Sequence, residues 1–160
     1  MKKSTLLIST TSIVAAAAAI FLSTQTISGE SSPENTNNPL ITVYKSATCG
    51  CCKKWVSYLE LEGFEVNSIN HDDVDSIKAQ NGLTDPSLKS CHTALVDGYI
   101  IEGHVPVSDI KRLLSEKPKA VGLTAPGMPM MSPGMNSIEP KDYDVLLFQK
   151  DGTQQVYSSY

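Results

Sequence analysis

The sequence predicts a single α/β domain, and three observations support that prediction. After residue 40, apolar β-type runs alternate with stretches of helical periodicity, a pattern typical of strands and helices packed in layers. Hydrophobic residues make up 41% of the 160 residues, an ordinary value for a protein with a buried core. Three cysteines, Cys49, Cys51 and Cys52, lie where the first apolar run passes into the first helical stretch.

The N-terminal residues have the pattern of an export signal. Two lysines precede an apolar run from about residue 6 to residue 22, and small polar residues follow. We therefore predict a secretory signal peptide over residues 1–28 and a flexible linker over residues 29–39, before a domain over residues 40–160. The alternative is an uncleaved membrane anchor, because the apolar run is close to the shortest length that spans a bilayer. In either case the signal segment is the only expected contact with a membrane.

The first strand and helix surround the three cysteines. A strand is predicted over residues 40–45, and Thr48 is a candidate N-cap for the helix that begins at the cysteines. Gly63 is expected to cap the C-terminal end of that helix. The buried face of the helix follows the i, i+3, i+4, i+7 spacing through Cys52, Trp55, Val56 and Leu59.

The next elements are shorter. We predict a strand over residues 64–69, a weak helix over residues 74–80 and one helical turn over residues 86–88. An Asp-Gly pair at residues 97–98 separates two β-type runs and predicts a hairpin. Pro106 suits the first turn of a third helix, which Pro118 is expected to end.

This order of elements predicts a thioredoxin-like domain. A strand that leads into cysteines at a helix start, followed later by a hairpin and a terminal helix, is the plan of that fold. In this plan, the loop before the third strand faces the cysteine turn across the end of the sheet. Cys91 and His92 occupy that loop, so we expect all four cysteines of the chain to share one pocket.

The C-terminal part is predicted to be a long Met/Pro/Gly-rich loop followed by a β-hairpin. Residues 120–142 have no usable period and hold four methionines, Met128, Met130, Met131 and Met135. Loops of this length in a compact domain are often lids or binding loops. The methionines either pack over the core as flexible fillers or contribute to a copper site. The hairpin is predicted over residues 143–148 and 154–157.

The cysteine pattern favours thiolate chemistry. The first N–H groups of a helix are unpaired and the helix dipole is positive there, and both effects stabilise a thiolate. Cys49 and Cys52 have the Cys-x-x-Cys spacing of redox-active turns, whereas Cys51 would compete for a catalytic disulfide. Crowded thiolates suit Cu(I), Zn or iron–sulfur clusters, and thioethers favour copper among these metals.

Three functions therefore stay open on the residues alone. The first is copper binding by the four cysteines, with His92 as a ligand or proton carrier and His104 as a structural residue or a further ligand. The second is a thiol–disulfide oxidoreductase that uses Cys49 and Cys52, with Cys91 as resolving thiol. The third is a structural module with two disulfides.

The charge pattern excludes one class of partner. The chain carries 13 basic and 17 acidic side chains, a formal net charge of −4, and the two signs are interspersed. Nucleic-acid binding requires a clustered basic face, so we expect no nucleic-acid partner.

Several motifs together resemble one bacterial family. They are Thr48-Cys49-Gly50-Cys51-Cys52-Lys53-Lys54-Trp55, Ser90-Cys91-His92-Thr93-Ala94, Glu102-Gly103-His104-Val105-Pro106 and Gly127-Met128-Pro129-Met130. Across about residues 42–157 the chain is similar to the exported CopG-type copper-resistance proteins, a metal-binding family of unknown function with a Cys-x-Cys-Cys motif. Met131 departs from the pattern, since a small residue is expected there.

The resemblance implies a thioredoxin-like fold, a periplasmic location and Cu(I) held by the cysteines, with a multinuclear thiolate cluster as one arrangement. It implies a role in copper tolerance, with copper ions and other periplasmic copper-handling proteins as partners. Redox cycling of copper, and thus a copper or thiol oxidoreductase activity, stays open, and no catalytic residue is assigned. The candidate metal ligands are Cys49, Cys51, Cys52, Cys91, His92, His104, Met128 and Met130.

Overall fold

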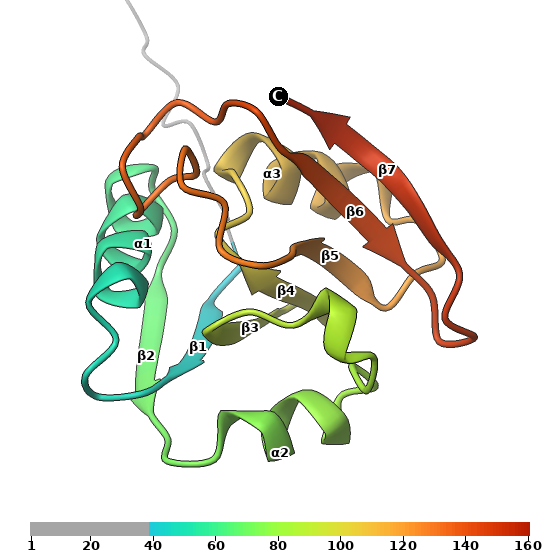
Figure 1. The fold of residues 1–160 in the computed structure, drawn as a ribbon, viewed down its shortest axis with the longest axis horizontal. Coiled ribbons are helices and arrows are strands. Elements are labelled where there is room, and N and C mark those ends of the chain that lie inside the picture. The colour runs from blue at the N-terminus through green and yellow to red at the C-terminus, as the bar shows by residue number, and fades with distance from the viewer. Residues whose placement is uncertain (1–38) are drawn as a thin grey trace, which may run out of the picture. The chain divides into compact units, whose positions relative to one another are not determined.

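A seven-stranded mixed sheet organises residues 39–160, the part of the chain that the computed structural model describes (Figure 1). The order of the strands is β2-β1-β3-β4-β5-β6-β7. The predicted signal peptide, residues 1–28, and all but the last residue of the predicted linker lie outside the described residues. Within the described part, no helix has the length and apolar character that crossing a membrane requires.

The elements follow one another in the predicted order as far as the third helix. Their bounds are β1 (Ile41–Lys45), α1 (Gly50–Leu61), β2 (Val66–Asn70), α2 (Val74–Gln80), the 3₁₀ turn η1 (Pro86–Leu88), β3 (His92–Val96), β4 (Tyr99–Gly103), α3 (Val107–Glu116), β5 (Gly122–Ala125), β6 (Asp144–Phe148) and β7 (Gln154–Ser159). β1 and β2 run parallel, whereas β3 is antiparallel to both β1 and β4. The predicted α/β class is confirmed.

The two faces of the sheet bury different clusters. Successive side chains of a strand point to opposite faces, and β4 shows this directly, since Ile101 joins the larger core cluster and Ile100 the smaller one. The larger cluster includes Trp55 from α1 and Ile110 from α3, so these two helices cover the same face. The smaller cluster lies on the opposite face and consists of Leu83, Leu88, Ile100 and Phe148.

β5 was not predicted, because residues 120–142 were expected to be a loop throughout. The strand pairs parallel with β4 and antiparallel with β6, and it therefore joins the C-terminal hairpin to the rest of the sheet. A Cβ atom at Gly122 would collide with the carbonyl oxygen of Ile100 on β4, so only glycine permits this close pairing. A four-residue strand that begins with glycine has too little alternation to be recognised from sequence.

Several predicted boundaries were wrong by a few residues. The N-cap of α1 is Cys49 and not Thr48. Pro106 is the N-cap of α3 and lies just outside its first turn, while Lys117, in a left-handed conformation, ends the helix before Pro118. β2 begins at Val66, two residues later than predicted. Gly63, with φ of 91°, follows the end of α1 as expected of a glycine C-cap.

Replacing Gly122 with alanine tests the role of β5. We expect Gly122→Ala to lower the free energy of unfolding by ~1–3 kcal/mol, the range for overpacked sites. The reason is that the new methyl group forces β4 and β5 apart. Urea unfolding followed by circular dichroism measures this change. Gly50→Ala is the matched control, since nothing lies within 4 Å of a Cβ atom there. Equal stability of the two variants would contradict the assignment of β5.

Candidate metal centre

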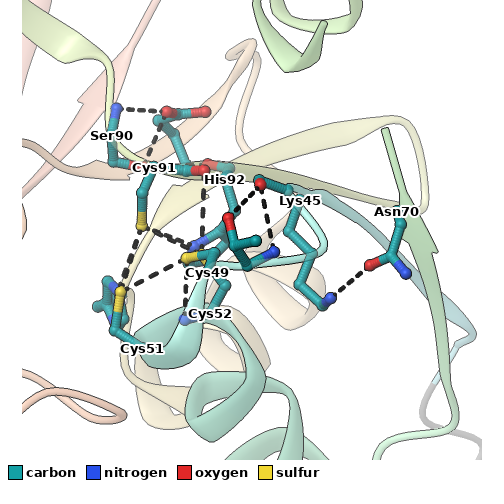
Figure 2. Close-up of a disulfide and its surroundings, with 12 residues drawn as sticks. Lys45, Cys49, Cys51, Cys52, Asn70, Ser90, Cys91 and His92 are labelled. Atoms are coloured by element: carbon teal, nitrogen blue, oxygen red, sulfur yellow. Dashed lines mark hydrogen bonds between the residues drawn. A yellow bond between two sulfur atoms is a disulfide. The ribbon is translucent and has the colours of Figure 1, made fainter. Parts of the chain in front are cut away.

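Four cysteine sulfurs meet at the N-terminal end of α1 (Figure 2). Cys49 caps the helix, Cys51 and Cys52 lie in its first turn, and Cys91 directly precedes β3. Because β1 and β3 are antiparallel neighbours, the end of β1 and the start of β3 lie at the same edge of the sheet. The four Sγ atoms all lie within 4.8 Å of one another, which confirms the predicted shared pocket.

The sulfurs are not all in the same chemical state. Cys49 and Cys52 form a disulfide, with their Cα atoms 5.3 Å apart, while Cys51 and Cys91 are free and half-buried. The Cys91 sulfur lies 3.3 Å from Cys52 Sγ and 3.7 Å from Cys51 Sγ, and Cys51 Sγ lies 3.5 Å from Cys49 Sγ. With two of the four thiols free, the module with two disulfides does not match this arrangement.

The local sequence explains why a sulfur occupies the helix cap. The Thr48 hydroxyl is hydrogen-bonded with the Ser46 hydroxyl at 3.0 Å, so it is turned toward the preceding turn. The Cys49 sulfur instead accepts a hydrogen bond from the Cys52 N–H at 3.3 Å. A sulfur in this position replaces the usual Ser or Asp cap and lies at the positive end of the helix dipole. The cap itself is thus one of the four candidate ligands.

Two histidines complete a second group of possible ligands around Cys91. Cys91 Sγ lies 3.5 Å from His92 Nδ1 and 3.7 Å from His104 Nε2, and both histidines are fully buried. Their rings meet edge to face, with centroids 5.1 Å apart. On the other side, Trp55 packs against the His92 ring at a centroid distance of 4.5 Å.

Both imidazoles are neutral at physiological pH. Burial lowers the pKa of His92 well below its ordinary value, and the nearby His104 and Lys78 act in the same direction. Burial also lowers the pKa of His104, although its bond to the Pro133 carbonyl opposes the shift. Because a carbonyl oxygen only accepts, His104 Nδ1 must donate that 2.7 Å bond, which leaves the Nε2 lone pair facing Cys91. Such a lone pair is what a metal ion requires.

Cys91 is held as a protonated thiol at neutral pH. Burial raises the pKa of Cys91 to about 12, with the adjacent Cys51 as the next largest cause, and the charge of Lys78 only partly opposes the shift. A metal that binds this sulfur must therefore displace its proton.

A buried ion pair holds the segment that carries Cys91, and sequence reasoning missed it. Lys78 Nζ lies 2.8 Å from Glu102 Oε1, with the two side chains 2% and 0% exposed. Glu102 Oε1 accepts bonds from the Ser90 N–H at 2.6 Å and the Ser90 hydroxyl at 2.9 Å, and Lys78 donates to the Ser90 carbonyl at 2.6 Å. The only sequence signal was a charged residue, Glu102, within an apolar strand.

This ion pair uses every polar group of Ser90. The backbone N–H, the backbone carbonyl and the hydroxyl of Ser90 are all hydrogen-bonded. These bonds fix the position of the peptide that leads into Cys91. A Cβ atom at Gly103 would lie 2.9 Å from Ser90 Cβ, so the strand beside this peptide also approaches closely. Burial raises the pKa of Glu102, and the charge and hydrogen bond of Lys78 counteract the shift.

The methionine loop, which we define as residues 126–143 between β5 and β6, is anchored beside the site at two points. The Gly127 N–H donates to the Lys89 carbonyl at 3.5 Å, two residues from Cys91, and the Pro133 carbonyl accepts from His104. Between these anchors, Met128 and Met130 are 39% and 60% exposed. The loop thus runs along the edge of the site, and the assignment of these two thioethers as ligands stays a prediction.

The loop also packs closely on α1. A Cβ atom at Gly134, where φ is 84°, would lie 2.7 Å from the backbone nitrogen of Trp55. Glycine is therefore required both for the backbone conformation and for the contact. This contact places the end of the methionine loop against the helix that begins at the cysteines.

The chain is similar to one family of known proteins and to two solved structures. A family model described as "Protein of unknown function, DUF411" matches residues 88–135, which include Cys91, His92, His104 and the four methionines of the C-terminal loop. Two solved structures, "Copper resistance protein copG- Form 2" and "Copper resistance protein copG- Form 1", are each 40% identical to the chain. Each match covers 76% of this chain and 98% of the other, with a TM-score of 0.70. The comparison with curated proteins found no match.

Removing one partner of the buried ion pair should destabilise the protein strongly. We expect Lys78→Met to lower the free energy of unfolding by about 3–5 kcal/mol, because Glu102 is left buried without its countercharge. Lys78→Met combined with Glu102→Gln should recover much of this loss, since a neutral amide still accepts the Ser90 bonds. Urea unfolding of the metal-free protein measures both. A single variant as stable as the native protein would show that the pair does not hold this segment.

The reactivity of Cys91 should depend on pH in an unusual way. In the metal-free protein with its disulfide intact, alkylation of Cys91 should rise about tenfold per pH unit to about pH 11, because only the thiolate reacts. The same residue in urea should level off near its ordinary pKa of about 8.5. Mass spectrometry of the iodoacetamide-treated peptide gives both rates. Levelling off near pH 8.5 in the folded protein would contradict the raised pKa.

Proposed function

Since the chain belongs to the family of CopG copper resistance proteins, we propose that it is an exported copper-binding protein that contributes to copper tolerance. The observation that carries the proposal is the group of four sulfurs within 4.8 Å of one another. Two distant segments supply these sulfurs, so the group exists only in the folded chain. A soft metal that accepts several thiolates fits this donor set, and Cu(I) is such a metal.

The ligands we propose are the four cysteines, with the histidines and two methionines at the edge. Cys49, Cys51, Cys52 and Cys91 hold Cu(I), and the crowding of their sulfurs favours bridging of more than one ion. His92 and His104 add neutral nitrogen donors beside Cys91, at 3.5 and 3.7 Å from its sulfur. Met128 and Met130, exposed in the loop anchored beside the site, add thioethers that favour copper over zinc.

Because two of the cysteines can form a disulfide, the number of thiols available to a metal depends on the oxidation state of the site. With Cys49 and Cys52 joined, two thiols are available, and full loading first needs two electrons and two protons to reduce the S–S bond. In the opposite direction, two Cu(II) ions oxidise two thiols to a disulfide, giving two Cu(I) ions and two protons. Redox cycling of copper at this site is part of the proposal.

The location of the protein is also proposed. The sequence pattern of residues 1–28 supports a signal peptide, and residues 29–39 support a flexible linker. We place the domain in the periplasm, where copper ions and other copper-handling proteins are its partners. A signal segment of this kind would be its only contact with the membrane.

A thioredoxin-like fold is the architecture we propose for the part of the domain that carries the site. Support comes from the order β1, α1, β2, α2, β3, β4, α3, with β1 and β2 parallel and β3 and β4 in a hairpin. The remaining strands, β5 to β7, extend the sheet beyond β4.

A second candidate function is a thiol–disulfide oxidoreductase. The Cys49–Cys52 disulfide favours it, because it has the Cys-x-x-Cys spacing and lies at a helix N-terminus. Cys91 Sγ lies 3.3 Å from Cys52 Sγ, close enough for Cys91 to act as the resolving thiol. The two functions differ in what they require of Cys51, which a dithiol enzyme does not use.

Titration with Cu(I) of the reduced protein and of Cys51→Ser separates these functions. Under anaerobic conditions with a competing chelator, the native protein should bind more than one equivalent. Cys51→Ser should weaken binding at least ~10-fold, equivalent to about 1.4 kcal/mol, because it removes one of the sulfur donors. Ser57→Ala, on the same helix, is the matched control and should bind as the native protein does. A Cys51→Ser variant that binds copper normally and reduces disulfides would favour the oxidoreductase.

A further inference from the structure

A groove with lysines at its margin runs along α1. It lies between the exposed side of the helix and residues 134–138, with a cavity volume of about 670 Å³. Figure 1 shows the segment after β5 passing beside α1. Lys53, Lys54 and Tyr58 contribute from the helix, and Met135 and Ile138 from the loop.

The helix side of the groove continues the face of α1 that carries Cys51. Cys51, Lys54, Tyr58 and Leu61 are spaced by three, four and three residues, so they lie on one face of α1. Cys51 is one of the two free, half-buried thiols of the site, and the other three residues line the groove. From Lys54 to Leu61 the helix advances about 10 Å, which suits an extended or helical segment.

Two of the most exposed apolar side chains of the described residues lie in this groove. Among the described residues, seven large hydrophobic side chains are exposed, and five of these belong to α1 or to residues 128–138: Leu61, Met128, Met130, Met131 and Ile138. Leu61 is 88% exposed and Ile138 76%, and both line the groove. A monomer leaves such side chains uncovered at a cost, so a concentration of them marks an interaction surface.

The charge of the groove indicates what covers it. Its lining includes Lys53 and Lys54 and no acidic residue, although the whole chain has a net charge of −4. The groove is therefore a locally basic surface on an acidic protein. A partner with carboxylates around an apolar centre complements it in both charge and polarity.

We propose that this groove docks an acidic segment of a partner protein. Apolar side chains of the partner would lie in the groove between the lysines and Ile138, and its carboxylates would face the lysines. Docking there brings the partner to the face of α1 that carries Cys51, a half-buried thiol of the sulfur site. The partner is thus a protein that exchanges copper with this site, and this part of the inference rests on the proposed function. The docking itself depends only on the groove.

A synthetic peptide tests the docking. The probe is a fluorescein-labelled helical peptide of 12 residues, with leucines on one face and glutamates flanking them, and the control peptide has lysine at every glutamate position. Fluorescence anisotropy with the purified, reduced, copper-free protein gives the dissociation constants. We expect the acidic peptide to bind and added salt to weaken it, since exposed charges are screened. The basic peptide should bind at least ~10-fold more weakly.

Variants assign the binding to the groove. Lys53→Glu with Lys54→Glu should weaken the acidic peptide at least ~10-fold, and Ile138→Ser should weaken it by a similar factor. Lys119→Glu with Lys141→Glu makes the same change in net charge outside the groove and should have no effect. All of these variants should bind Cu(I) in the native stoichiometry, which separates a failure of docking from a failure of the copper site.

Three results would overturn the proposal. They are no binding of the acidic peptide, equal binding of the basic one, or equal weakening by the two lysine pairs. Analytical ultracentrifugation of the protein alone supplies a fourth. A dimer that Ile138→Ser dissociates would show that a second copy, and not an acidic partner, covers the groove.

Discussion

The pairing of β1 with β3 is the constraint on which the site depends. Cys91 is 39 residues from Cys52 in the chain, and it reaches the first turn of α1 because the two strands end at the same edge of the sheet. The register, in which Lys45 pairs with His92, sets how far Cys91 projects past that edge. A shift of one residue would send the His92 side chain to the opposite face of the sheet. The chemistry of the site is therefore a consequence of strand register.

At this end of β1 and β3, burial keeps His92, His104 and Cys91 in their neutral forms. Both imidazoles lose their proton because burial disfavours the charged form, and Cys91 keeps its proton for the same reason. The buried charges nearby, Lys78 and Glu102, are paired with each other and positioned against Ser90. The outer edge of the site differs from this interior, since its methionine loop and the lysines of α1 are exposed. The donor set therefore combines two buried imidazoles and the buried Cys52 with three half-buried cysteines.

Much of this organisation follows from short-range sequence patterns, and the rest depends on contacts that no local pattern encodes. The strand-to-helix turn at the cysteines, the helix over residues 74–80 and the Asp-Gly hairpin were predicted from periodicity and turn residues. β5 was missed because its pairing relies on the absence of a side chain at Gly122. The role of Glu102 on β4 was missed because its partner, Lys78, comes from helix α2 and only the fold brings them together. Cys49 was chosen as a ligand but not as the helix cap, since serine and threonine are the expected caps and sulfur is not.

Protection of the cysteines by copper tests the central claim most directly. The reduced protein is loaded with Cu(I) without oxygen and alkylated, and mass spectrometry reads the modification of each cysteine. Our account predicts that Cys49, Cys51, Cys52 and Cys91 become protected together, over the same range of added copper. Modification of Cys91 at its copper-free rate, while the three cysteines of the α1 turn are protected, would contradict a site built from both segments.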